Sequence, residues 1–398
     1  MPRITKLRTA VVRANFNWTY ARVYTDEAHG TGECFFAPGL PQIIEEFEAI
    51  LIGEDPQNIE KLVEKMRWAA SGTGSLGGII WNAITGIEAA LWDLKGKLTN
   101  LPVYQLLGGK CRFAVDCYAH SSGRDNKELE DSVKRNVERG FRHIRLQVGG
   151  YGSPHLSKSV DFKEAGYGLP RDTNMDSYPY LKATPKAFEH IRNVFGDELE
   201  LLHDIHERIA PIEAVNLLKE LEKYRPFFIE DPVAPEDNGY FEFIRKHTTV
   251  PIAMGELFNS PHEWVPLITG RLIDFIRVHI SQAGGLSVAR KIATLAEWFN
   301  VRTAWHGPGD LSPVGHACNA HLDLAIRNFG IQESLLFNEA TQEVFSGCPT
   351  YKNGYMHINE KPGWGVDIDE EKAKKYPYPE HPGYWEPVRR RDGTAVRP

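Results

Sequence analysis

The chain has 398 residues, of which 42% are hydrophobic and 25% charged, a composition typical of globular proteins with a large core. Its 46 Lys and Arg against 53 Asp and Glu give a net charge of −7 without a basic block, so we expect no nucleic acid partner. No stretch approaches the roughly 18 apolar residues of a membrane span, and the run MPRITKLRTAVVRANF has no continuous apolar segment, so we expect a cytoplasmic protein with no membrane partner.

The first hundred residues combine strand and helix patterns. Residues 1–36 alternate between apolar and polar side chains in the manner of a hairpin and meander, and residues 41–109 carry helical periodicity, most clearly in Trp81–Leu98. These patterns predict an α+β domain, which we place at residues 1–112.

From about Phe113 short apolar runs alternate with amphipathic helices, the pattern of repeated βα units. Eight such runs predict an α/β protein with a (β/α)₈ TIM-like barrel at residues 113–345. The runs are FAVDCYAH (113–120), HIRLQV (143–148), LELLHDIH (199–206), FFIEDPV (227–233), IAMGE (252–256), IDFIRVHI (273–280), VRTAWHG (301–307) and FGIQES (329–334).

Two segments fall outside this repeat. After the second strand, residues 149–183 form a loop of roughly 35 residues, a length that in a compact domain indicates function. The tail at 346–398 is rich in Pro, Gly and aromatic residues, and we expect it to pack back on the N-terminal domain.

The predicted strands end in polar side chains, which the barrel would gather on one rim, the face where barrel active sites lie. Three carboxylates among them are evenly spaced, because 26 residues separate Asp204 from Glu230 and again Glu230 from Glu256. Each step advances one βα unit and reaches an equivalent height on the next strand. The complete set is Asp204, His206, Glu230, Asp231, Glu256, Arg277, His279, His306 and Glu333.

A single carboxylate at a strand end is more often a helix cap or half of a surface ion pair than a ligand. Three carboxylates directed into the same end of the barrel would repel one another unless a cation lay between them. Hard carboxylate oxygens suit Mg²⁺, whereas thiolates or a histidine cluster would have indicated zinc. We therefore predict that Asp204, Glu230 and Glu256 bind Mg²⁺.

Several motifs resemble those of the enolase superfamily and, within it, of the D-mannonate dehydratase-like subgroup, which dehydrates sugar acids. They are LLHDIHERIAPIEA, FFIEDPVAPED, PIAMGELFNS, HGPGDLSPVGHA, NFGIQES and PGWGVDIDEE. The resemblance covers nearly the whole chain. It implies a modified (β/α)₈ barrel with an N-terminal α+β capping domain completed by the C-terminal tail, and Mg²⁺ on the third to fifth strands.

The resemblance also implies catalytic roles. His206 would be the acid that protonates the departing 3-hydroxyl, and Arg145 would support a loop tyrosine that acts as the base. Tyr151 is the nearest candidate for that tyrosine, Tyr167 the next, and His306 the alternative base.

Further residues would contact the substrate, namely His120, Arg277, Asp310 and Glu333 together with His306. Three departures from the mannonate dehydratase pattern indicate lower selectivity. Ala37 and Pro38 replace an expected asparagine, Pro308 replaces an alanine, and the C-terminus GTAVRP lacks a terminal tryptophan.

We therefore predict a hydro-lyase that removes water from a sugar acid, D-mannonate or D-gluconate among its substrates, in a homo-oligomer. Arg145 and Gln147 stand where racemases and cycloisomerases place lysines, which disfavours those reactions. Two alternatives stay open. One is a catalytically weak or inactive relative with a small-acid binding or regulatory role, and the other is a dehydratase of an amino-acid-derived or short dicarboxylic acid.

Overall fold

A computed structural model describes residues 2–13, 16–73, 77–149, 173–174, 177–377, 388–389 and 394. The chain forms two compact units, and the barrel strands are divided between them. Unit 1 comprises Met1–Cys117, Gly255–Thr269 and Ile276–Pro382. Unit 2 comprises Tyr118–Met254, Gly270–Phe275 and Gly383–Pro398.

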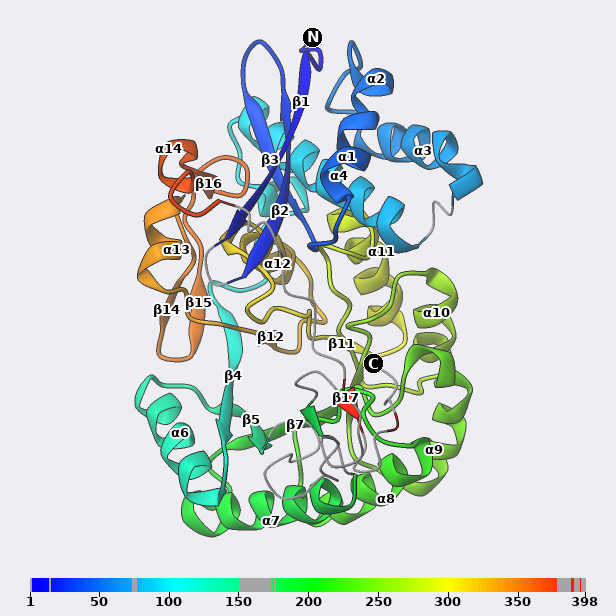
Figure 1. Cartoon of the computed structure of the whole chain (residues 1–398), viewed down its shortest axis with the longest axis vertical. Helices are drawn as coiled ribbons and strands as arrows, with labels where there is room; N and C mark the ends of the chain where they lie inside the picture. Colours follow the sequence, from blue (N-terminus) through cyan, green and yellow to red (C-terminus); the bar gives the residue numbers. More distant parts are fainter. Residues whose placement is uncertain are drawn as a thin grey trace, which may run out of the picture. The chain divides into compact units, whose positions relative to one another are not determined.

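Unit 1 begins with an antiparallel meander of β1 (Lys6–Arg13), β2 (Asn17–Tyr24) and β3 (His29–Cys34) (Figure 1). The long helix α4 (Gly78–Thr99) packs on β3 because two glycines remove the side chains between them. A Cβ on Gly30 would lie 2.0 Å from the Ala90 carbonyl oxygen, and one on Gly32 would lie 2.1 Å from that of Gly86. The expected meander and helix are thus present. The remaining helices of this region are α1 (Leu40–Glu46), α2 (Glu48–Leu51), α3 (Ile59–Ala69), η1 (Ser71–Thr73) and α5 (Val103–Leu106).

All eight predicted runs contain strands of one sheet, in the order β11, β10, β9, β8, β7, β5, β4, with β12 also pairing with β4. This arrangement confirms the predicted (β/α)₈ barrel. The strands are β4 (Val115–Gly123), β5 (His143–Val148), β7 (Glu200–Asp204), β8 (Phe228–Glu230), β9 (Ile252–Met254), β10 (Phe275–Ile276), β11 (Arg302–Thr303) and β12 (Gln332–Glu333).

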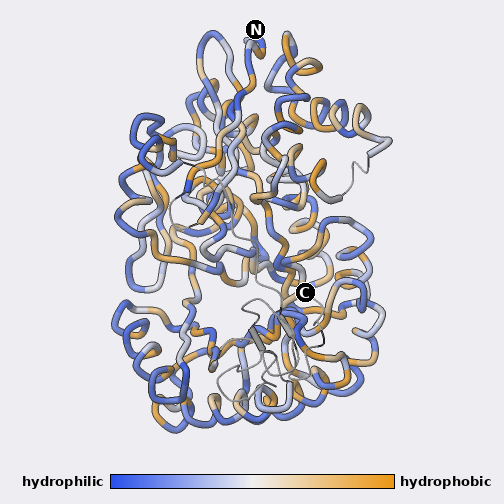
Figure 2. Tube along the Cα trace, in the orientation of Figure 1, coloured by the Kyte–Doolittle hydropathy of each residue, from blue (hydrophilic) through white to orange (hydrophobic). Residues whose placement is uncertain are grey.

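Helices follow the strands, and those of unit 2 carry hydrophilic residues along their outer sides (Figure 2). Their starts have local causes; for example, the Asp125 side chain accepts hydrogen bonds from the first-turn N–H groups of α6. Unit 2 contains α6 (Asn126–Glu138), α7 (Ser177–Phe195), α8 (Pro211–Leu221), η3 (Glu222–Tyr224), η4 (Pro235–Tyr240) and α9 (Phe241–His247), besides the paired strands β6 (Thr173–Asn174) and β17 (Val388–Arg389). Unit 1 contains α10 (Pro261–Thr269), α11 (Gly285–Trp298) and α12 (Pro313–Ala325).

The described part of the C-terminal segment contacts the N-terminal meander within unit 1. The indole N–H of Trp364 donates to the Thr31 carbonyl oxygen at 3.1 Å, and Arg22 pairs with Asp367 at 2.6 Å. The predicted domain limits themselves stay a prediction. The elements that follow β12 along the chain are α13 (Glu339–Val344), β13 (Phe345–Ser346), β14 (Thr350–Lys352), β15 (Tyr355–His357), β16 (Asp367–Ile368) and α14 (Glu370–Ala373).

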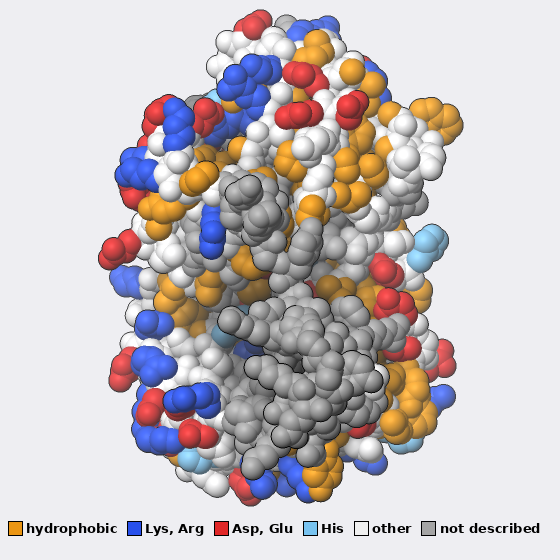
Figure 3. Space-filling model, viewed as in Figure 1, with side chains coloured by type: hydrophobic (Ala, Val, Ile, Leu, Met, Phe, Trp, Pro, Cys, Tyr) orange, Lys and Arg blue, Asp and Glu red, His pale blue; other side chains and the backbone are white. Residues whose placement is uncertain are grey.

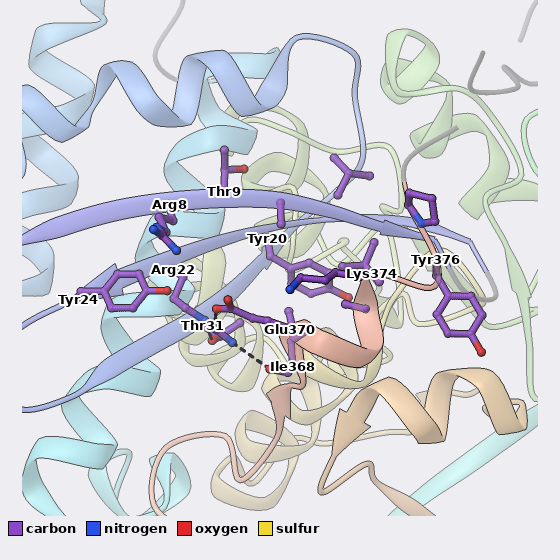
Figure 4. A pocket seen from close by; sticks show the side chains of 15 residues that line it. Arg8, Thr9, Tyr20, Arg22, Tyr24, Thr31, Ile368, Glu370, Lys374 and Tyr376 are labelled. Atoms are coloured by element: carbon purple, nitrogen blue, oxygen red, sulfur yellow. Dashed lines mark hydrogen bonds and ion pairs between the residues drawn. The ribbon is translucent and has the colours of Figure 1, made fainter. Parts of the chain in front are cut away.

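A cavity of about 410 Å³ lies between the meander and α14 (Figure 4). Arg22, which lines it, is held by Asp367 and Glu370. The predicted site residues do not line this cavity, so it is not a candidate active site.

The described surface carries both signs of charge. Figure 3 shows basic and acidic side chains interspersed on the visible face. Among the described residues, no helix combines the length and apolarity that crossing a bilayer requires.

Candidate active site

In unit 2, two carboxylates end two neighbouring strands. Asp204 is the last residue of β7 and Glu230 the last of β8, and the parallel register places them opposite each other. Both side chains are fully buried. Burying ionised carboxylates in this way costs folding free energy unless cations balance their charge.

Arg145 on β5 supplies one such cation. One guanidinium nitrogen donates to Asp204 at 3.0 Å and to Glu230 at 3.1 Å. The other lies 3.1 Å from the Nδ1 atom of His120 on β4. The guanidinium therefore touches both predicted metal ligands of this unit. The two buried carboxylates thus share this guanidinium.

His206 lies beyond the end of β7 rather than on it. Strand alternation predicted that its side chain shares the face of Asp204, but β7 ends at Asp204 and His206 adopts a left-handed conformation with φ 56°. Its Nδ1 atom nevertheless lies 3.4 Å from the Asp204 carboxylate. The turn, and not the alternation, therefore brings the predicted acid beside the predicted ligand.

This turn stores backbone strain. Glu207 and Asp231 also have positive φ, at 53° and 38°, in regions that non-glycine residues rarely occupy. The Glu207 N–H donates to the Asp231 carbonyl oxygen at 2.9 Å, which holds the two strained segments together. Strain of this kind clusters at functional sites because the surrounding structure must enforce it.

The third predicted ligand, Glu256, follows β9 by two residues and belongs to unit 1. The preceding Gly255 has φ 132°, a conformation that favours glycine. Arg277 is fully buried and bonds Glu256 at 2.5 Å and Glu333 at 2.7 Å. Arg277 and Glu333, both predicted to bind substrate, therefore hold each other in place.

His306 lies among three carboxylates of unit 1. Its Nε2 atom is 3.1 Å from Asp310, and its Nδ1 atom is 3.5 Å from Glu256 and 3.4 Å from Glu333. Burial would lower the pKa of His306, but Asp310 and Glu256 raise it well above its usual value. For Asp310, burial raises the pKa and the neighbouring His306 lowers it, with a net fall. The two groups therefore favour each other's charged forms.

His279 lies beside this pair. Its ring centroid is 4.7 Å from that of His306, and Phe35 contacts it edge-on at 5.0 Å. Burial and the neighbouring His306 lower its pKa to about 3, so the ring is neutral.

Glu33 on β3 anchors the loop that carries Asp310, a role that the sequence did not predict. Its carboxyl group accepts hydrogen bonds from the Ser312 N–H at 3.1 Å, from the Ser312 hydroxyl and from the Gly315 N–H at 2.9 Å. Trp18 adds a bond from its indole N–H to the Gly309 carbonyl oxygen at 3.2 Å. Nothing in the run HGTGEC distinguishes this glutamate from a surface residue, because its partners are about 280 positions away.

The structure gathers the predicted site residues into two groups, one in each unit. Tyr151 and Tyr167 lie outside the described residues, so the predicted tyrosine base is untested. The unit 2 group is His120, Arg145, Asp204, His206 and Glu230. The unit 1 group is Glu256, Arg277, His306, Asp310 and Glu333.

Two family models match the chain. Residues 9–108 match the mandelate racemase / muconate lactonizing enzyme N-terminal domain, and residues 128–372 match the enolase C-terminal domain-like model. The two matches together span most of the chain.

Curated relatives match it over its full length. A D-galactonate dehydratase family member from Salmonella enteritidis PT4 is 42% identical, with 100% of this chain and 99% of the relative covered. One from Paenibacillus is 43% identical with 100% of both chains covered.

Solved structures agree. A crystal structure of an enolase from Pantoea ananatis with bound D-gluconate and Mg has a TM-score of 0.92 and 42% identity, and all of both chains is covered. An enolase from Agrobacterium radiobacter with bound Na and L-malate has a TM-score of 0.85 and 27% identity, with 99% of each chain covered. These matches confirm the enolase-type fold and the resemblance drawn from the motifs. The chain belongs to the enolase superfamily and, within it, to the D-galactonate dehydratase family of hydro-lyases.

Proposed function

We propose that this enzyme is a Mg²⁺-dependent dehydratase that converts an aldonic acid to a 2-keto-3-deoxy acid. The observation that carries the proposal is the buried pair Asp204 and Glu230, both bonded by Arg145, at the carboxyl ends of adjacent barrel strands. The relative from Pantoea ananatis, with D-gluconate and Mg bound, supports both the cofactor and the substrate class.

The residues present fit Mg²⁺. Asp204, Glu230 and Glu256 offer carboxylate oxygens, the donors that this ion prefers, and all three are buried. We assign these three as its ligands because each ends or closely follows one of three successive strands, β7, β8 and β9. When bound, Mg²⁺ supplies electrostatic stabilisation of the charge that develops on the substrate carboxylate.

The chain's own residues then move two protons. A base removes the proton from C2, and the electron pair of the broken C–H bond moves toward the carboxylate, which gives an enediolate. That electron pair then forms the C2–C3 double bond as the C3–O bond breaks. His206 gives its proton to the departing hydroxyl, which leaves as water, and the resulting enol tautomerises to the 2-keto acid. We assign the base to Tyr151 supported by Arg145, with His306 as the alternative.

The remaining polar residues would position the substrate. His120 lies against Arg145 in unit 2, and Arg277, Asp310 and Glu333 surround His306 in unit 1. Ala37 and Pro308 replace the residues expected in a selective mannonate dehydratase. We therefore propose that D-mannonate and D-gluconate are both accepted, with low selectivity.

A library of sugar acids, assayed for 2-keto-3-deoxy products with Mg²⁺ present, tests the proposal. Replacing Glu230 by Gln removes a ligand charge at almost constant volume, so we expect Mg²⁺ affinity and product formation to fall about 100-fold or more. Glu220→Gln makes the same chemical change at an exposed position of α8 and should alter neither.

Two results would count against the proposal. Equal Mg²⁺ affinity in wild type and Glu230→Gln, measured by calorimetry, would show that Glu230 is not a metal ligand. Tight binding of a sugar acid without any keto acid product supports the alternative of a binding or regulatory relative.

A further inference from the structure

The histidine cluster of unit 1 has the donor set of a second kind of metal site. His279, His306 and Asp310 each offer one ligand atom, and these atoms lie within 4.8 Å of one another. The Nε2 atom of His306 is 3.1 Å from the Asp310 carboxylate, and that of His279 is 3.9 Å from it. Ligands about 2.1 Å from a tetrahedral Zn²⁺ lie about 3.4 Å apart, so small side-chain shifts would bring all three onto one ion.

The surroundings of His306 orient it for this role. Its Nδ1 atom faces Glu256 and Glu333, at 3.5 and 3.4 Å. Metal-binding histidines commonly give the second ring N–H to a carboxylate. Zn²⁺ would take the place of the proton that the Nε2 atom shares with Asp310, and this proton would be released to solvent. Arg277, bonded to both glutamates, holds these carboxylates in place.

His279 is otherwise unexplained. Its side chain is 2% exposed, and neither ring nitrogen has a hydrogen-bond partner among the described residues. Buried polar atoms without partners are rare in native proteins and call for an ion, a water or a ligand. An ion pair between His306 and Asp310 accounts for those two residues but leaves the His279 nitrogens without a function.

We propose that His279, His306 and Asp310 form a binding site for Zn²⁺, distinct from the carboxylate site assigned to Mg²⁺. Two imidazole nitrogens and one carboxylate oxygen suit Zn²⁺ and bind Mg²⁺ poorly, because Mg²⁺ demands an octahedral shell of oxygen atoms. The Asp310 side chain is 16% exposed, so solvent reaches one of the three ligands.

Occupancy of this site has a functional consequence that rests on the proposed function. Zn²⁺ would occupy the Nε2 atom of His306 and the Asp310 carboxylate, both assigned to the substrate or the reaction. We therefore expect chains that hold Zn²⁺ here to be inhibited, even when Mg²⁺ is saturating.

The test measures metal binding without substrate, so it does not depend on whether a dehydratase substrate is found. The full-length chain, saturated with Mg²⁺, is titrated with Zn²⁺ and with Co²⁺ as a spectroscopic probe. We expect one Zn²⁺ per chain and, for Co²⁺, the intense visible bands of a four-coordinate site with nitrogen ligands. His279→Asn should weaken Zn²⁺ binding at least about 10-fold and remove those bands.

Matched variants separate the outcomes. His262→Asn, at an exposed position of α10, should leave Zn²⁺ binding unchanged. If His279→Asn does not fold by circular dichroism, His279→Gln takes its place, with the same expected loss. The proposal is overturned if the folded His279 variant binds Zn²⁺ as wild type does. It is also overturned if Glu230→Gln alone abolishes binding, which would place Zn²⁺ on the carboxylates, or if His262→Asn weakens it equally, which would mark adventitious surface binding.

Discussion

Replacing Arg145 by Met tests whether the guanidinium and Mg²⁺ serve the same two carboxylates. The change removes the donor that bonds Asp204 at 3.0 Å and Glu230 at 3.1 Å and leaves an apolar side chain of similar length. Removing one partner of a buried charge pair costs about 3–5 kcal/mol, because the remaining charges stay buried without compensation. The Arg145 side chain is only 11% exposed, so solvent screens little of this loss.

The assay is thermal unfolding with and without Mg²⁺. Without the ion we expect the melting temperature to fall by about 4 °C, from a loss of about 3 kcal/mol. At 100 times its dissociation constant, a ligand that binds only the folded state adds about 2.7 kcal/mol. Mg²⁺ should therefore restore most of the stability of the variant, and its gain should exceed that of wild type, where Arg145 already offsets part of the charge.

Arg192→Met is the control, because Arg192 belongs to the same unit but bonds carbonyl oxygens of Tyr224 and Leu199. It should lower stability without changing the increment from Mg²⁺. The reasoning fails if Arg145→Met melts as wild type does, or if Mg²⁺ stabilises wild type and Arg145→Met equally.

Two further predictions concern single groups. His206→Asn should abolish keto acid formation, because the acid is lost. It should retain exchange of the C2 hydrogen with deuterated solvent, followed by NMR, because exchange needs only the base. Loss of both activities would indicate that His206 is the base. Burial raises the pKa of Glu33 to about 8, against about 4.5 in the unfolded chain. Between these two pH values only the folded state keeps the Glu33 proton. The free energy of unfolding therefore falls as pH rises through this interval. Denaturant unfolding of Glu33→Gln should show a weaker fall over that interval, and an unchanged pH profile would refute the assignment.

The fold was predictable because it depends on local patterns. Each of the eight apolar runs contains a barrel strand, and the residues predicted as the long helix Trp81–Leu98 lie within α4. Strand lengths were not predictable in the same way. The run 273–280 contains a strand of only two residues, Phe275–Ile276, although Val278 beyond it still accepts a backbone hydrogen bond from His306 at 3.3 Å.

The site was predictable where residue spacing follows the βα repeat. Equal spacing identified Asp204 and Glu230, which the strand register places opposite each other. Spacing cannot reveal contacts between distant segments, and so Glu33 was missed. Nor can alternation describe His206, since its left-handed backbone depends on how β7 ends.

The charges of the two groups constrain the order of binding. Asp204 and Glu230 share the Arg145 guanidinium. In unit 1, Glu256 and Glu333 share the Arg277 guanidinium. At short range the carboxylates would repel a sugar acid anion, whereas a bound divalent cation would attract it. The affinity for the anion should therefore rise when Mg²⁺ is bound first, and titrations of the anion at increasing Mg²⁺ should show that dependence.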